Sequence, residues 1–545
     1  MLAQLVDRFP GGRALWLGEL FHEAARRHPG LPIHLDHQLH CGFAEVPEPV
    51  SRFEPSDRAA FDVDLAARLV EQLSARMTAA GLHEGRYVAI YHADSFDIPL
   101  LAAAVSRGGG VPVLLSPYLP PSTAVQLVAK LGDPTVIVDG NASADLRARF
   151  AEHGPVWHTD RTSGLVTGAG AAHPVRRLRR DPDRPMLVTH TSGTTRLPKL
   201  TVHTARSLWY RVAPQRVISL LLDPASPAMF SITLVHTRFY MALGMFLWHG
   251  KPLIIACDNA LPAIAQTLHA HRPDYLETHP NTFVDWEPLA EQPSAPLRSV
   301  KIFHAAFDAI HPRTMRVFLQ ASGSRNARFF RFYGQSEVGP STGRYYTRRN
   351  VHTAAGQCVG WPIPGFTSVR IVDDLGNRVR RGQAGHIEVD SRSRILTYLG
   401  DEQLFERNRH GSWWDTGDLG HLDRFGRLHL HDRQIDTIDA VGSALYYEDI
   451  LMESLPAARE AVITELSGTP VALVSAHDDR QLDLAQATRI LATVPGLRSA
   501  YLVRHEMFPV TATRKVQRPL LKERLADRRF LDDHLLAEID LTGSR

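Results

Sequence analysis

One stretch near the N-terminus constrains the fold of this chain more than any other. Tyr87–Tyr91 has the composition of a strand, Ile98–Val105 that of a helix, and Val111–Leu115 that of a second strand. A strand, a crossover helix and another strand form the β-α-β unit of parallel sheets covered by helices. The same order recurs at residues 252–277 and 300–332. The sequence therefore predicts an α/β fold.

The pattern changes twice in the second half of the chain. After Gly360 short β segments alternate with turns, which predicts a small β-rich subdomain that completes the large domain. A further unit of alternating helices and strands begins near Asp432 and predicts a compact α+β domain. Because 545 residues exceed the usual size of one domain, we expect an N-terminal domain over 1–431 and a C-terminal domain over 432–545.

Composition excludes several classes of protein. A formal net charge of +3 is close to neutral and argues against a nucleic-acid partner. The cysteines Cys41, Cys257 and Cys358 are few and far apart, which favours a reducing compartment. Met1–Arg8 lacks the pattern of a signal peptide, and Phe239–Cys257 reads as a buried helix, a turn and a strand. We therefore expect a cytoplasmic protein without a membrane partner.

A polar loop follows the apolar run Pro185–Val188. The segment His190–Lys199 contains four hydroxyls, one glycine and one of only six lysines in the chain. Backbone N–H groups, hydroxyls and a cation at the end of a strand can bind a polyphosphate. The spacing is not that of a Walker loop. Taken alone, the segment also fits a polar surface turn.

Three later segments carry side chains suited to nucleotide chemistry. Arg331–Gly339 combines aromatic residues, glycine, a hydroxyl and a carboxylate; Trp414–Gly420 contains Thr-Gly-Asp; Phe508–Arg518 contains a lysine. An aromatic face suits a base, a hydroxyl can donate to an oxyanion, and a carboxylate is a hard ligand for Mg²⁺. Each segment alone also fits an ordinary turn or surface residue, so their common order is the informative feature.

In this order the segments resemble the adenylate-forming superfamily, which comprises acyl-CoA synthetases, peptide-synthetase adenylation domains and luciferases. The resemblance extends from about Asp64 to about Leu525. It implies a large N-terminal domain of two α/β subdomains plus a β subdomain, with a mobile C-terminal lid. It also implies that a substrate carboxylate attacks the α-phosphorus of MgATP and releases pyrophosphate. A nucleophile then captures the acyl-adenylate after the lid rotates.

The resemblance assigns roles to the motif residues. Lys515 would bridge carboxylate and phosphate oxygens, Ser336 would meet the α-phosphate, Glu337 would be the metal ligand for Mg²⁺, and His236 would stand at the wall of the acid pocket beside the reacting atoms. The residues implied for nucleotide binding are Thr191, Ser192, Gly193, Thr194, Thr195, Lys199, Ala306, Phe307, Phe332, Tyr333, Gly334, Asp418 and Arg433. The residues implied for the acid pocket are His236, Thr237, Ala305, Gly334 and Gly339.

Several positions depart from the family pattern. Arg196 and Arg514 replace glycines of the phosphate loop and of the lysine segment. Arg331 replaces a residue that reads adenine in relatives, so base recognition would depend on backbone groups around Ala305, Ala306 and Phe307. Thr237 stands where relatives that bind α-amino acids carry Asp. This disfavours an α-amino acid and leaves a fatty, short-chain or aryl acid.

The acceptor is less clearly indicated than the activation step. Ile435 and Asp439 replace a polar hinge residue and a lysine in the segment that faces the thiol channel. CoA carries several phosphates and needs cations near its entrance. The candidates are therefore thioester formation with CoA or carrier-protein phosphopantetheine, and amide formation with an amine. A catalytically silent nucleotide-binding protein is the third alternative.

One histidine cluster invites a metal interpretation. His34, His37, His40 and Cys41 lie close together near the N-terminus. No second group of ligands follows at the spacing of a zinc site. We therefore expect Ile33–His40 to form a strand with solvated histidines.

Overall fold

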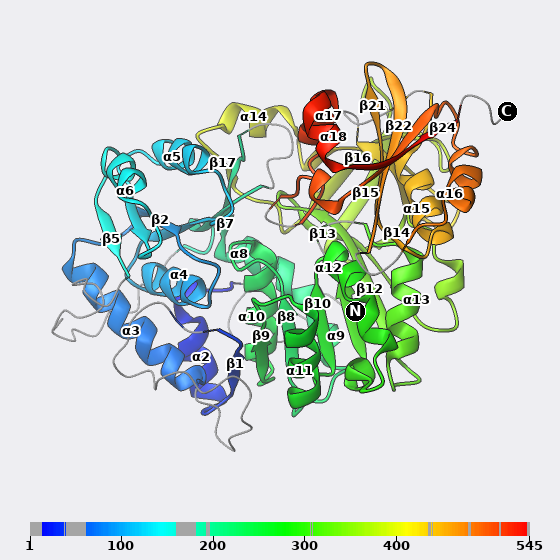
Figure 1. Cartoon of the computed structure of the whole chain (residues 1–545). Helices are drawn as coiled ribbons and strands as arrows, with labels where there is room; N and C mark the ends of the chain where they lie inside the picture. Colours follow the sequence, from blue (N-terminus) through cyan, green and yellow to red (C-terminus); the bar gives the residue numbers. More distant parts are fainter. Residues whose placement is uncertain are drawn as a thin grey trace.

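The structure, a computed structural model, describes residues 14–37, 39, 61–159, 181–191, 197–305, 307, 309–433, 438, 440–477, 481–511 and 514–541. At Asp432 and Arg433 it describes the backbone alone. The chain forms a mixed α/β protein with a large N-terminal domain and a smaller C-terminal domain (Figure 1). The predicted fold class is confirmed.

The first sheet contains the β-α-β unit that the sequence predicts. Its seven strands run in the order β17-β7-β6-β3-β2-β4-β5. These strands are β2 (Tyr87–Tyr91), β3 (Val111–Leu115), β4 (Thr135–Val138), β5 (Val156–His158), β6 (Pro185–His190), β7 (Leu200–Thr204) and β17 (Thr397–Leu399). The helices around it are η1 (Leu17–Glu19), α2 (Leu20–Arg27), α3 (Val63–Ala79), α4 (Asp97–Arg107), α5 (Pro121–Ala129) and α6 (Ala144–Ala151). β2 and β3 pair in parallel with α4 between them in sequence, as predicted.

The two faces of this sheet are covered by different helices. Val88 and Ile90 pack with α3 and α4, whereas Ala89 and Val113 pack with α5 and α6. Alternate residues of a strand point to opposite faces, so the uninterrupted apolar run of β2 suits a strand buried on both sides. Figure 1 shows α3 and α5 on opposite sides of the sheet.

The second sheet has thirteen strands and holds most of the candidate site. Its order is β1-β9-β8-β10-β11-β12-β13-β14-β20-β19-β16-β15, and β18 pairs with β19. The parallel part is formed by β1 (Ile33–Leu35), β8 (Ala228–Ser231), β9 (Leu253–Ile255), β10 (Tyr275–Thr278), β11 (Ile302–Ala305) and β12 (Arg328–Gln335). The remaining strands are β13 (Gly339–Tyr346), β14 (Cys358–Pro362), β15 (Thr367–Val372), β16 (Gly385–Ser391), β18 (Arg409–His410), β19 (Trp413–Leu422) and β20 (Leu428–Arg433).

The helices of this part lie between its strands in sequence. They are α8 (Ala205–Val212), α9 (Arg216–Ser219), α10 (Thr237–Trp248), α11 (Leu261–His271), α12 (Pro280–Asp285), α13 (Pro312–Ala321) and α14 (Glu402–Arg407). Short 3-10 turns occur at η2 (Ala213–Gln215), η3 (Glu287–Glu291), η4 (Pro296–Ser299) and η5 (Val351–Thr353). The β-rich part after Gly360 is present, and the antiparallel pairing of β12 with β13 and of β13 with β14 joins it to the parallel strands.

The segment Phe239–Cys257 has the structure that the sequence predicts. Every residue of α10 from Thr237 to Leu247 is buried, and β9 follows after a turn. A helix that is apolar on all sides belongs in a core. In the described part of the chain, no helix is both long enough and apolar enough to span a membrane.

The C-terminal domain contains its own sheet, in the order β21-β22-β23-β24. Its strands are β21 (Ala458–Leu466), β22 (Thr469–Ala476), β23 (Ser499–Val503) and β24 (Leu535–Asp540). Its helices are α15 (Ala444–Ser454), α16 (Leu484–Leu491), η7 (His505–Met507), α17 (Arg518–Ala526) and α18 (Arg528–His534). Two apolar clusters pack on the two faces of this sheet, one with α15 and α16 and one with α17 and α18. We call this domain the lid.

Candidate active site

The candidate site lies at the carboxyl ends of the parallel strands of the large sheet. His236 follows β8, His279 follows β10, Phe307 follows β11, and Ser336 and Glu337 follow β12. Because β8, β10, β11 and β12 run in parallel, these residues emerge at the same edge. Ligands of open α/β sheets bind at that edge.

Glu337 is held in place by a residue of the other sheet. Its side chain is 9% exposed, and the Tyr398 hydroxyl donates to its Oε1 at 2.5 Å. Burial and then the charge of Glu337 raise the pKa of Tyr398, so the phenol keeps its proton and acts as a donor. Lys199 Nζ lies 5.0 Å from the centre of the Tyr398 ring. A fixed carboxylate beside a lysine suits a Mg²⁺–phosphate group.

His236 and Ser336 lie side by side. The backbone N–H of Arg238 donates to His236 Nδ1 at 3.1 Å, so the ring proton belongs on Nε2, 3.3 Å from Ser336 Oγ. Burial and the nearby Arg211 lower the pKa of His236 to about 3, which keeps the imidazole neutral. Arg211 Nη2 also donates to the Ser336 carbonyl at 2.7 Å. His236 can therefore donate a hydrogen bond without carrying charge.

The aromatic segment and the ribose carboxylate also meet. The Tyr333 hydroxyl and Gln335 Nε2 donate to Asp418 Oδ2 at 2.7 and 3.0 Å. A Cβ on Gly334 would come within 2.1 Å of the Gly339 carbonyl oxygen, so the hairpin requires glycine at position 334. The structure thus brings Tyr333 and Asp418 together, as a nucleoside site needs, although 85 residues separate them.

The phosphate loop is described only at its base. Thr191 N donates to the Lys199 carbonyl at 3.0 Å, and Lys199 N donates to Thr191 Oγ1 at 3.1 Å, which closes the loop. The remaining loop residues expected at the phosphates lie outside the described residues: Ser192, Gly193, Thr194, Thr195 and Arg196. Ala306, Ile435, Asp439 and the side chain of Arg433 lie outside them as well.

The Arg331 side chain is buried against the segment before β14. It is 1% exposed, and its guanidinium donates to the carbonyls of Ala355, Gly356 and Cys358. Its position in the motif is therefore used to hold the neighbouring segment. Adenine recognition through backbone groups around Ala305, Ala306 and Phe307 stays a prediction.

Lys515 lies on a tight turn of the lid beside α12. Thr511 N donates to the Lys515 carbonyl at 2.9 Å, and Lys515 N donates to Thr511 Oγ1 at 3.2 Å. Asn281 Nδ2 donates to the Arg514 carbonyl at 3.0 Å. Arg514 has φ of +58°, the left-handed conformation for which the family uses glycine. The backbone of the lysine segment is therefore kept although its glycine is replaced.

The lid contacts the large domain through polar groups. Arg313 donates to the carbonyls of Met452, Leu455 and Ala458 at 2.7 to 2.9 Å. His311 Nδ1 lies 2.8 Å from Asp449 Oδ1. Arg459 also pairs with Asp285, at 2.7 Å. These contacts place the Lys515 turn beside the strand ends that carry the rest of the site.

Two histidines, His236 and His279, lie against the ring of Phe307. The ring centre of Phe307 lies 4.8 Å from that of His236 and 4.6 Å from that of His279. Burial and then the charge of Arg514 lower the pKa of His279 to about 3. Thr237 and Ala305 are each 1% exposed, and no described residue bonds to Thr237 Oγ1. The wall is therefore neutral, as expected when Asp is absent from position 237.

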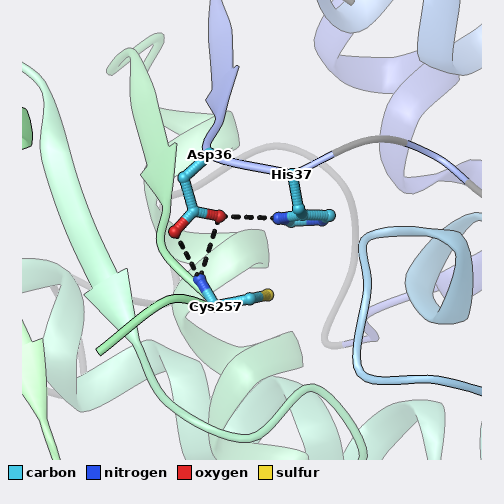
Figure 2. Close-up of side chains that lie close together, drawn as sticks. All are labelled: Asp36, His37 and Cys257. Atoms are coloured by element: carbon cyan, nitrogen blue, oxygen red, sulfur yellow. Dashed lines mark hydrogen bonds and ion pairs between the residues drawn. The ribbon is translucent and has the colours of Figure 1, made fainter. Parts of the chain in front are cut away.

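The N-terminal histidines do not form a metal site with the described residues. Figure 2 shows Asp36 between His37 and the backbone of Cys257. His37 Nδ1 lies 2.7 Å from Asp36 Oδ1, and Phe96 N donates to His37 Nε2 at 2.9 Å, so both ring nitrogens are used. Burial raises the pKa of the Cys257 thiol well above its ordinary value. Asp36, His37 and Cys257 are the grouping with metal-ligand spacing, and their bonds are structural.

The expectation of solvated histidines on a long strand is wrong for the described residues. β1 ends at Leu35, and His37 is bonded on both nitrogens. His34 stacks on His271 with ring centres 4.3 Å apart. Burial lowers the pKa of His34 to about 4. His40 and Cys41 lie outside the described residues.

The sequence did not reveal the residues that support this site. Tyr398 and Arg211 hold Glu337 and Ser336 from 61 and 125 residues away. A buried cluster of Arg238, Glu277 and His304 lies behind His236. No local pattern points to such partners, although the charged Arg238 within an apolar helix was a signal.

Known proteins resemble this chain over most of its length. It is 40% identical over 551 residues to 3-amino-2-hydroxy-4-methoxybenzoate diazotase of Streptomyces cremeus, covering 95% of this chain and 97% of that protein. It is 25% identical over 497 residues to indoleacetate–CoA ligase of Aromatoleum aromaticum, covering 86% and 93%. The structure of ATP-bound MatB from Rhodopseudomonas palustris shares the fold, with a TM-score of 0.76, 19% identity and coverage of 94% and 99%.

The family described as AMP-binding enzyme matches residues 64–399, more than half of the chain. This match agrees with the motif order and with the site at the carboxyl ends of the strands. The resemblance drawn from the sequence is confirmed. The chain belongs to the AMP-binding enzyme family.

Proposed function

We propose that this protein is an ATP-dependent diazotase that adenylates nitrite and transfers the nitrosyl group to the amine of an aromatic carboxylate. The observation that carries this proposal is 40% identity across 95% of the chain with a diazotase of a substituted aminobenzoate. The site supports it, because the groups expected for adenylation are present in the described residues: Lys199, Glu337, Asp418 and Lys515.

The chemistry is a variant of acid activation. Nitrite resembles a carboxylate in being a planar oxyanion, so one of its oxygens can attack the α-phosphorus of ATP while the bond to pyrophosphate breaks. The amine nitrogen then attacks the nitrosyl nitrogen, an N–N bond forms, and AMP leaves with the electron pair of the N–O bond. The N-nitroso compound tautomerises and loses water, so the amine and the adenylated nitrite give a diazonium ion, AMP and water.

The residues of this chain fit the first step. Glu337, held by Tyr398, would bind Mg²⁺, which neutralises phosphate charge when bound. Lys515 would place a cation at the phosphorus, where negative charge grows during attack. Asp418 beside Tyr333 would hold the ribose. His236 would donate to an oxygen of the nucleophile or the phosphate.

An amine acceptor also agrees with the changes in the thiol segment. An amine brings no phosphate, so it needs none of the cations that CoA requires at its entrance. Asp439 replaces a lysine and Ile435 replaces a polar residue in that segment. A neutral wall at Thr237 is suited to an aromatic ring and not to an α-ammonium group.

The test incubates the protein with MgATP, nitrite and a panel of aminobenzoates at mildly alkaline pH, where free nitrite does not diazotise amines. Pyrophosphate and AMP are measured together with the azo dye formed on coupling the product to a naphthol. We expect dye formation that requires ATP, nitrite and amine together. Absence of nitrite-dependent pyrophosphate release with every amine would overturn the proposal.

A second candidate is activation of a carboxylic acid. The 25% identity to indoleacetate–CoA ligase over 86% of the chain favours it. The chain would then convert a fatty, short-chain or aryl acid to an acyl-adenylate and transfer it to CoA, to a carrier-protein phosphopantetheine or to an amine. Pyrophosphate release with an acid panel in the absence of nitrite separates this candidate from the first. ATP binding without turnover in either assay would favour a silent nucleotide-binding protein.

A further inference from the structure

A charged cluster is buried directly behind the residues expected to line the acid pocket. Arg238 lies in the first turn of α10, Tyr275 and Glu277 lie on β10, and His304 lies on β11. Glu277 and His304 are register partners on adjacent parallel strands, and Tyr275 shares the face of Glu277 because it is two residues away. Tyr275 and Glu277 are fully buried, and His304 is 1% exposed. We call these four residues the Arg238 cluster.

The contacts within the Arg238 cluster use one nitrogen of His304. The Arg238 guanidinium forks onto both oxygens of Glu277, and the Tyr275 hydroxyl donates to Glu277 Oε2 at 2.7 Å. His304 Nδ1 lies 2.6 Å from the Tyr275 hydroxyl and 3.3 Å from Glu277 Oε2. Arg238 Nη2 lies 3.1 Å from the same nitrogen and donates to Glu277 Oε2. His304 Nε2 is buried and has no hydrogen-bond partner in the described part of the chain.

His304 lies next to residues that are expected to form the site. His304 immediately precedes Ala305 at the carboxyl end of β11, and its ring contacts Phe332 at 5.1 Å between centres. Arg238, which contacts the Nδ1 edge of the ring, is two residues from His236. A buried polar atom without a partner costs about 1–3 kcal/mol. Such a cost is typical of a group that meets a ligand.

We propose that His304 is the base that takes the proton from the amine acceptor. This inference rests on the proposed function, since it concerns the second step at the same site. As the amine nitrogen attacks the nitrosyl nitrogen and AMP leaves, one N–H proton passes to His304 Nε2. After the N-nitroso compound tautomerises, His304 returns that proton to the hydroxyl group, which departs as water, so His304 ends unchanged.

The rest of the Arg238 cluster positions and supports this base. Because the Tyr275 proton is donated to Glu277, the Tyr275 oxygen can accept the Nδ1 proton of His304, which leaves Nε2 with its lone pair. When Nε2 gains a proton, the imidazolium faces the negative charge of Glu277. Burial raises the pKa of Glu277, but the charge of Arg238 lowers it by more, so this carboxylate stays ionised.

The test separates the two half-reactions in His304→Asn and His304→Gln. Asparagine keeps a polar atom near the position of Nδ1 and glutamine keeps one near Nε2, but neither is a base. We expect nitrite-dependent pyrophosphate release within about twofold of wild type. We expect dye formation to fall by about 10²-fold or more in both variants, as for loss of a general base. His271→Asn, at the end of α11 where the ring stacks on His34, is the matched control and should leave both steps unchanged.

Two outcomes overturn the assignment. Dye formation retained in His304→Gln would mean that a hydrogen bond suffices, and an equal fall of both half-reactions would mean that His304 is structural. If the wild-type protein released no pyrophosphate with nitrite, the proposed function itself would fail, and that result is visible before any variant is made.

Tyr275→Phe tests whether the Tyr275 hydroxyl positions His304, and it leaves the His304 side chain itself unchanged. It removes the oxygen that accepts from Nδ1 and keeps the ring. Since Tyr275 is a positioning residue, we expect kcat for dye formation to fall by about tenfold with the KM for the amine unchanged. An unchanged kcat in a variant with wild-type melting temperature would contradict this positioning role of Tyr275.

Discussion

The two halves of the candidate site are held in different ways. In the large domain Tyr398 and Arg211, which are 0% and 1% exposed, fix Glu337 and Ser336. On the lid side, Arg514 lies 3.8 Å from Asp285, with side chains 38% and 26% exposed. Exposed ion pairs of this kind contribute about 0–1 kcal/mol each. The comparison shows that Glu337 and Ser336 are held by buried partners, whereas the segment that carries Lys515 is held at its edge by partly exposed charges.

The largest effect is expected where the lid half meets the chemistry. Lys515→Ala should reduce adenylation by about 10²–10³-fold, because one preorganised cation at the phosphorus is lost. Pyrophosphate release in a single turnover measures this step. Lys522→Ala, a lid lysine 3.8 Å from Glu465, is the control and should be active. If nitrite-dependent pyrophosphate release in a single turnover is unchanged in Lys515→Ala, the assignment of Lys515 to the first step is wrong.

The fixed half should dominate nucleotide affinity. Asp418→Ala removes a carboxylate that meets Tyr333, and charge-assisted bonds to ribose are worth about 1.5–3 kcal/mol each. ATP binding should weaken at least about tenfold with the fold intact. Calorimetric titration with ATP measures this, and Asp401→Ala, which removes a surface partner of Lys130, serves as the comparison variant. Equal affinity in Asp418→Ala and wild type would refute the ribose role.

A milder change tests the contribution of the first sheet, whose strand β17 carries Tyr398. Tyr398→Phe keeps the ring beside Lys199 and removes the donor to Glu337. The carboxylate then lacks one fixed bond, so we expect the Mg²⁺ concentration for half-maximal pyrophosphate release to rise by roughly five- to tenfold, about 1–1.5 kcal/mol. A rise in the KM for ATP alone, without a change in Mg²⁺ dependence, would argue against a metal role for Glu337.

The smallest expected effect concerns pH and the lid. Burial lowers the pKa of His311, but the hydrogen bond and the charge of Asp449 raise it by more, so the net pKa lies above 6.5. A raised histidine stabilises the docked lid fully below its ordinary pKa, and this contribution disappears as pH rises through the raised value. Protease sensitivity of the lid should therefore increase as pH rises above the ordinary histidine pKa of 6.5. His311→Asn should remove this pH dependence, and a wild-type profile in that variant would contradict it.

Much of the fold could be predicted because local patterns specify it. The run Tyr87–Tyr91 is buried on both faces and coincides with β2. In contrast, α18 and β24 were not predicted. β24 is a half-exposed edge strand whose partner β23 ends at Val503, so its register depends on contacts distant in sequence.

The residues of the candidate site also fall into those that the sequence could predict and those that it could not. Glu337, Asp418 and Lys515 could be named because nucleotide chemistry requires those residue types within short motifs. Tyr398 and the Arg238 cluster could not, since they act through side chains that meet only after the sheets form. The boundary between the domains and the roles of the motif residues remain predictions.

The Arg238 cluster has a consequence for how this branch of the family can change over evolutionary time. Loss of one member of a buried ion pair costs about 3–5 kcal/mol, whereas replacement of both members by apolar residues of similar size is neutral or stabilising. Substitution of Arg238 or Glu277 alone is therefore expected to destabilise the protein. The two residues can be replaced without this cost only when both change together. Thr237, which is neutral and outside that pair, can be substituted alone.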